Sequence, residues 1–156
     1  MLEKILLAVD ESEHARKAVP AAIELARAGG GTVHVLHVRE LVYARATVVG
    51  DTPAEAERLV AEVVEELKGA GVAAEGVVRT ATFGPARAIL EHARDLDASM
   101  IVIGSRGLGA LGGLLLGSVA HKIIQLATCP VLVVRDKQDL DDRHHDVLRA
   151  QTRFQA

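Results

Sequence analysis

The chain has 156 residues, of which 49% are apolar and 25% charged, and its formal net charge is −3. This length suits one domain with one hydrophobic core, and the composition is that of a globular protein rather than a disordered or fibrous one. With a slight negative charge and only three aromatic residues, the chain is a poor match for nucleic acid, which needs a positive field for its phosphates and rings that stack on its bases.

The first half of the chain predicts alternating strands and helices. Residues 5–9 are a short apolar run that ends at Asp10, and Ser12 and Glu13 then open a helical pattern that stops at the glycines 29–31. The next segments predict a second strand over 32–38, a long loop over 39–51, and a helix over 52–69 whose start carries the capping pair Thr52 and Glu55 around Pro53.

The second half continues the alternation and ends in a polar segment. Its predicted elements are a weaker third strand at 73–80, a helix at 84–96, a fourth strand at 99–103, a helix at 118–126 and a fifth strand at 130–134. From residue 136 the sequence is almost wholly polar, so we divide the chain into a folded domain, 1–136, and a solvated tail, 137–156. Five near-continuous apolar strands that alternate with helices predict a parallel sheet covered on both faces, a three-layer α/β/α fold.

The start of the chain and its single cysteine bear on where the protein works. Residues 1–4 lack the basic and apolar segments of a secretory signal, and the glycine and leucine run 108–116 is too short to cross a bilayer. Cys129 stands alone, so it forms no intrachain disulfide, and its place before Pro130 and an apolar strand favours a packed thiol over a catalytic one. We therefore expect a cytoplasmic protein with no membrane partner.

The glycine-rich segment 104–118 is the strongest functional signal. It follows an apolar strand and opens a helix, so its glycines let the backbone approach a ligand while the helix start presents free N–H groups to an anion such as phosphate. Residues 107–112 match G-x-G-x-x-G, but the match begins four residues after the strand, and little chain remains for a second nucleotide half. Residues 112–118 have the spacing of a P-loop with serine in place of the required lysine.

A third pattern spans the whole segment: Gly104, two residues, Gly107, nine residues, then Gly117 and Ser118. This pattern resembles the nucleotide motif of the ATP-binding branch of the universal stress protein family. The resemblance extends to residues 5–12, 34–38 and 129–134, and covers residues 1–135. It implies an adenine nucleotide alpha hydrolase-like fold with strand order 3-2-1-4-5, in which Asp10 and Gly104 face one crevice.

The resemblance also implies the ligand and the residues that hold it. ATP, with Mg²⁺ as a bridging cation, is the implied ligand. Adenosine would lie beside Ala8, Val9, Asp10 and Val38, the ribose and phosphate approach beside Ile103 and Gly104, and the phosphates beside Gly107, Gly117, Ser118 and Val119. Arg106 is either a phosphate contact or a solvated loop residue, Asp10 is a ligand contact or a helix cap, and Ser118 is expected to cap its helix as well as bind phosphate.

The sequence favours binding over catalysis. No serine–histidine–acid set and no paired carboxylates accompany the glycine segment, and His34 and His37 point to opposite faces of their strand, so they cannot readily share a metal ion. We expect an ATP-binding stress-response protein with at most slow ATP hydrolysis, and a homodimer through the apolar fifth strand. The alternatives are an NAD-binding enzyme fragment and a dimeric interaction module without a ligand.

Overall fold

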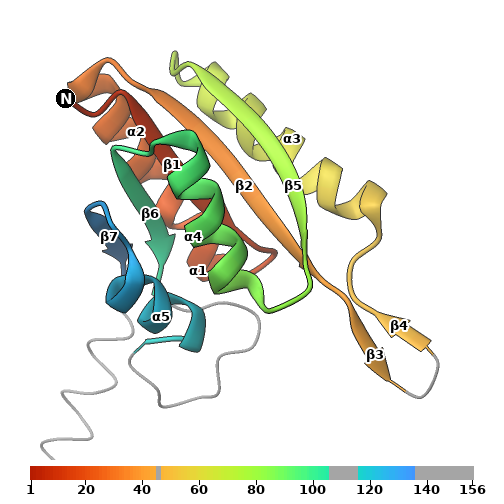
Figure 1. The fold of residues 1–156 in the computed structure, drawn as a ribbon. Helices are drawn as coiled ribbons and strands as arrows, with labels where there is room; N and C mark the ends of the chain where they lie inside the picture. The colour runs from red at the N-terminus through yellow and green to blue at the C-terminus, as the bar shows by residue number, and fades with distance from the viewer. Residues whose placement is uncertain (45–46, 106–115, 136–156) are drawn as a thin grey trace, which may run out of the picture.

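The computed structural model describes residues 1–44, 47–105 and 116–135, with side chains described throughout except at 42–49. Its main sheet has five parallel strands: β1 (Lys4–Val9), β2 (Thr32–Glu40), β5 (Ala74–Ala81), β6 (Met100–Gly104) and β7 (Val131–Val134). Their order is β5-β2-β1-β6-β7 (Figure 1). Numbered along the chain as the five strands of this sheet, this is the predicted order 3-2-1-4-5, which is confirmed.

Helices cover both faces of the sheet, as the three-layer prediction requires. On one face lie α1 (Glu13–Arg16), α2 (Ala18–Gly29) and α3 (Pro53–Gly69), and on the other lie α4 (Pro85–Leu96) and α5 (Ser118–Leu126) (Figure 1). Alternate strand residues supply the two cores, so Leu7 and Val35 pack with the first group and Leu6 and Leu36 with the second. The sheet is therefore apolar on both faces, which explains the near-continuous apolar strands.

The predicted first helix is two helices, which corrects the sequence analysis. α1 ends at Arg16, Lys17 joins the two, and α2 begins at Ala18. Pro20 has no N–H to donate to the carbonyl of Arg16, so one continuous helix would lose a hydrogen bond there, whereas proline is tolerated in the first turn of a new helix.

Other helix ends follow the predicted signals. Gly30 ends α2 in the left-handed conformation, with φ 69°. At the start of α3, the Thr52 hydroxyl accepts from the Glu55 amide at 3.2 Å, while the Glu55 carboxylate accepts from the Thr52 amide at 2.7 Å. The predicted capping box is therefore present.

The segment 39–51 is not the loop that we predicted. β2 continues to Glu40, and an antiparallel hairpin follows, formed by β3 (Val42–Ala44) and β4 (Thr47–Val49). Valine, tyrosine and threonine favour extended backbone, but strands of three residues are too short to show a period in the sequence. The hairpin forms a separate two-stranded sheet that extends from the end of β2 (Figure 1).

Candidate functional site

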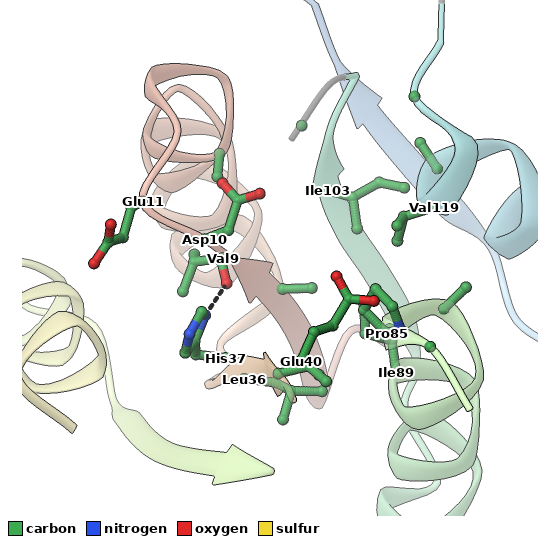
Figure 2. Close-up of a pocket in the computed structure, with 18 of the residues that line it drawn as sticks. Val9, Asp10, Glu11, Leu36, His37, Glu40, Pro85, Ile89, Ile103 and Val119 are labelled. Carbon is green, nitrogen blue, oxygen red and sulfur yellow. Dashed lines mark hydrogen bonds between the residues drawn. The ribbon is translucent and has the colours of Figure 1, made fainter. Parts of the chain in front are cut away.

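A cavity of about 780 Å³ opens at the carboxyl ends of the strands (Figure 2). The pairing of β1 with β6 ends at Leu7 and Val102, whereas β1 stays paired with β2 as far as Val9 and β6 stays paired with β7 as far as Gly104. The two halves of the sheet thus separate at their carboxyl ends. This is the topological switch point, where open α/β sheets bind their ligands, and the cavity has the size of a small-molecule site.

Nine of the eleven residues predicted for the site line this cavity. They are Ala8, Val9, Asp10, Val38, Ile103, Gly104, Gly117, Ser118 and Val119. The remaining two, Arg106 and Gly107, lie outside the described residues, as does the G-x-G-x-x-G match at 107–112. The fold therefore brings the ends of β1, β2 and β6 and the start of α5 to one place.

Two helices begin at the cavity, and neither start has a side-chain cap. α4 begins at Pro85 after Gly84, and α5 begins at Ser118 after Gly117. All four residues line the cavity, and Figure 2 shows Pro85 beside it. Because both N-cap residues are glycines, no cap side chain occupies the N–H groups of these first turns, and such helix starts attract anions.

The structure corrects one expectation at the start of α5. Ser118 does not cap the helix, because Gly117 is the N-cap. Ser118 is the first residue of the helix, and it is exposed. Gly117 has φ −64° and ψ 155°, which any residue can adopt, so the turn does not need a glycine. A side chain at position 117 would instead take up space in the cavity, because Gly117 is buried and lines it.

Asp10 shapes the turn that leads from β1 into α1. Its Oδ1 accepts a hydrogen bond from the Ser12 amide at 2.8 Å. The cap of α1 is Ser12, whose Oγ accepts from the Ala15 amide at 3.1 Å. The alternative that Asp10 caps the helix is therefore wrong, and its side chain lies at the cavity (Figure 2).

Gly104, at the end of β6, has no room for a side chain because the backbone of α1 packs against it. A Cβ at this position would lie 2.5 Å from the carbonyl oxygen of His14 and 3.1 Å from the amide nitrogen of Ala15, both in the backbone of α1. The short helix therefore rests directly on the end of β6. Gly104 both lines the cavity and allows α1, which follows Asp10, to lie close to the sheet.

His37 and Asp51 form a polar wall of the cavity that the sequence analysis missed. Nδ1 of His37 lies 2.8 Å from the carbonyl oxygen of Val9, and its Nε2 lies 2.7 Å from Oδ2 of Asp51. The guanidinium of Arg39 donates to the carbonyl oxygen of Asp51 at 2.8 and 3.0 Å. His37 is 5% exposed, and it shares no partner with His34, which pairs with Glu75. The two histidines thus have different partners, as expected for side chains on opposite faces of one strand.

Apolar side chains from several elements complete the cavity. Leu36, Ile89, Ile103 and Val119 lie around it in Figure 2, and Ala86 adds to the wall from the first turn of α4. Leu36 and Ile89 were not predicted, although their strand and helix were. A wall of this kind suits a flat ring that carries polar groups at its edge.

The comparisons with known proteins decide the family. Residues 1–135 match the sequence model of the universal stress protein family. The chain is also 39% identical over 149 residues to universal stress protein YxiE of Bacillus subtilis, which covers 86% of this chain and all of that protein. The chain belongs to the universal stress protein family.

Solved structures with the same fold support this assignment. The hypothetical protein MJ0577 is 25% identical with a TM-score of 0.74, and the match covers 88% of this universal stress protein and 98% of that chain. The universal stress protein from Archaeoglobus fulgidus in complex with dAMP is 26% identical with a TM-score of 0.66, covering 85% and 98%. Among the described residues, no helix is long and apolar enough to cross a membrane.

The described wall of the cavity in this universal stress protein carries more negative than positive charge. Carboxylates come from Asp10, Glu11, Glu40, Asp51 and Glu55, and an ammonium group comes from Lys122. The Thr52 amide and hydroxyl, which donate to Glu55, hold the pKa of that carboxyl below its ordinary value. Among the described residues, no three histidine, cysteine or acidic side chains are arranged to hold a metal ion.

Proposed function

We propose that this universal stress protein binds an adenine nucleotide, ATP, in the cavity at the switch point. The observation that carries the proposal is that two helices, α4 and α5, begin at one cavity of about 780 Å³, each after a glycine that offers no side-chain cap. Uncapped first-turn N–H groups favour phosphate, and the apolar wall favours a planar base. The dAMP bound by the related protein of Archaeoglobus fulgidus supports the same class of ligand.

The charges of the wall favour one orientation of the nucleotide. The phosphates would lie at Gly117, Ser118 and Val119, near Lys122. The two other predicted phosphate contacts, Arg106 and Gly107, lie outside the described residues. Adenosine would lie against Ala8, Val9, Asp10, Val38, Ile103 and Gly104. The carboxylate of Asp10 can accept hydrogen bonds from ribose hydroxyls or from the adenine amine.

Mg²⁺ would accompany the triphosphate without a protein cage of its own. The described residues hold no cluster of metal ligands, so the cation would take phosphate oxygens and water. It would offset the repulsion between the triphosphate and the carboxylates of the cavity wall. We expect ATP to bind more weakly when EDTA removes the divalent cation.

Calorimetry with ATP, AMP and NAD, each with and without Mg²⁺, tests the proposal. The expected result is saturable binding of the adenine mononucleotides at one site per chain, with NAD weaker. Tighter binding of NAD would favour the dehydrogenase-fragment alternative, and a lack of any nucleotide binding would favour an interaction module. Hydrolysis measured on the same samples is expected to be slow, because the sequence shows no serine–histidine–acid set and no paired carboxylates beside the glycine segment.

We further propose a homodimer that pairs through β7. This strand is an edge of the main sheet, its four residues are only half-buried, and the neighbouring Ile124 and Leu126 of α5 are 48% and 64% exposed. An apolar edge strand is rarely left uncovered. Light scattering that reports a monomer at micromolar concentration would overturn this. The cytoplasmic location, the stress-response role and the division into residues 1–136 and 137–156 remain predictions, and the tail lies outside the described residues.

A further inference from the structure

The strongest unassigned feature is a polar cluster at the edge of the cavity, formed by the buried His37 with the half-buried Asp51 and Arg39. It joins the end of β1 to the connection between the hairpin and α3 through side chains of β2. His37 is 5% exposed, and the side chains of Arg39 and Asp51 are 15% and 18% exposed. Polar groups buried to this extent are costly unless they are paired, so their pairing specifies the local geometry.

The partners of His37 determine where its protons lie. The carbonyl oxygen of Val9 can only accept, so Nδ1 of His37 donates to it. Nε2 then faces the Asp51 carboxyl at 2.7 Å, within hydrogen-bond distance. Each ring nitrogen therefore has a defined and different task.

The bond to Val9 fixes a peptide that borders the cavity. In a trans peptide, the C=O and the following N–H point in opposite directions. A Val9 carbonyl turned toward His37 on β2 therefore directs the Val9–Asp10 peptide as a whole, and with it the start of the Asp10 side chain. The Asp10 carboxylate accepts a hydrogen bond from the Ser12 amide. His37 thus fixes the peptide that leads into Asp10, and the turn fixes the carboxylate.

The bond to Asp51 ties the same peptide to the base of the hairpin. Gly50 crosses the end of β2 so closely that a Cβ there would lie 2.5 Å from the carbonyl oxygen of Glu40. Arg39 holds the Asp51 carbonyl while His37 holds its carboxyl. Glu40, Gly50 and Asp51 all line the cavity, so one wall of the site is fixed by this cluster.

We infer that His37 is a positioning residue of the nucleotide site: its Nδ1 sets the Val9–Asp10 peptide for the ligand, and its Nε2 holds the wall formed by Asp51. The inference rests on the proposed nucleotide site. It assigns no contact with the nucleotide to the imidazole itself. It also explains why a histidine, rather than an apolar side chain, occupies this buried position on β2.

Two substitutions separate the tasks of the ring. The amide of asparagine reaches about as far as Nδ1, so His37→Asn can keep the bond to Val9 while losing Asp51. The amide of glutamine reaches about as far as Nε2, so His37→Gln can keep Asp51 while losing Val9. His34→Asn is the matched control, since His34 lies on the same strand, pairs with Glu75 and does not line the cavity.

The experiment is calorimetry with Mg-ATP on these variants, with urea unfolding on the same samples. We expect His34→Asn to bind like the wild type. His37→Asn should lose less than about threefold in affinity, because Arg39 still holds Asp51. His37→Gln should lose about tenfold or more, the scale of a lost hydrogen bond to a positioned group. A purely structural role would make the loss of affinity follow the loss of stability across all variants, and that result would overturn the inference. Equal affinity of His37→Gln and the wild type would also overturn it, whereas a wild type that binds no nucleotide would refute the proposed function instead.

Discussion

Replacing Gly104 by alanine tests whether α1 must rest on the end of β6. The added Cβ would lie 2.5 Å from the His14 oxygen, 2.8 Å from the His14 carbonyl carbon and 3.1 Å from the Ala15 nitrogen. All three atoms belong to the backbone, so no side chain can rotate away, and the helix itself must move. Overpacking of this kind costs about 1–3 kcal/mol of folding free energy.

The assay is urea and thermal unfolding of the Gly104→Ala variant, together with ATP binding. For a chain of this length, each kcal/mol lowers Tm by roughly 2–4 °C. Affinity should fall as well, because displacement of α1 moves the turn that holds Asp10. Gly69→Ala is the control: Gly69 is exposed at the end of α3, its Cβ would meet nothing within 4 Å, and alanine there should stabilise by up to about 1 kcal/mol. A Gly104→Ala variant as stable as the wild type would show that α1 is not held where the structure has it.

Three further predictions concern the phosphate site, the pH dependence of stability and the reactivity of Cys129. Gly117→Val should abolish ATP binding by filling the phosphate space, while Ser118→Ala, which removes one hydroxyl, should weaken it by about 0.5–3 kcal/mol; calorimetry on folded variants that reversed this order would contradict the proposed phosphate position. Burial, and secondly the Arg79 guanidinium, lower the pKa of His92 below 6.5, so the folded state takes up this proton less readily than the unfolded state and stability should fall as pH drops below about 6.5. His92→Gln should flatten that fall in urea titrations between pH 7 and pH 5, and an unchanged slope would contradict it. Burial raises the pKa of the Cys129 thiol above 9.0, so a disulfide reagent at pH 8 should label it more slowly than free cysteine until urea unfolds the chain; fast labelling of the folded protein would count against a packed thiol.

Much of the fold could be predicted because the strands and helices are long and carry local signals. The apolar strands, the glycine stop at Gly30 and the capping box of Thr52 and Glu55 each follow from a few neighbouring residues. The strand order depended on the family resemblance, since pairing between distant strands leaves no local mark. The hairpin was missed because its strands have three residues each, and the break between α1 and α2 was missed although Pro20 marked it.

The residues of the site likewise include some that could be predicted from the sequence and some that could not. Residues at the ends of β1 and β6 and the start of α5 could be predicted, because they adjoin the glycine segment or share the family motif. The cluster of His37, Arg39 and Asp51 joins β2 to a connection that we had assigned to a loop, so no local pattern indicated that these side chains would meet. The available signal was positional: His37 lies one residue before Val38, and the ends of parallel strands meet at one edge.

Several charged residues of the cavity wall were not predicted, and they distribute charge unequally around the cavity. Glu40, Asp51 and Glu55 come from the end of β2 and the approach to α3, whereas Lys122 and the uncapped helix start come from α5. Like charges repel, so a triphosphate turned toward the β2 side would meet the repulsion of several carboxylates. Turned toward α5, it meets a positive helix end and an ammonium group, and the hydroxyls of the ribose are left facing carboxylates that can accept their hydrogen bonds. The carboxylates thus favour a single direction for the proposed nucleotide, in a chain whose overall charge of −3 gives no hint of where the phosphates lie.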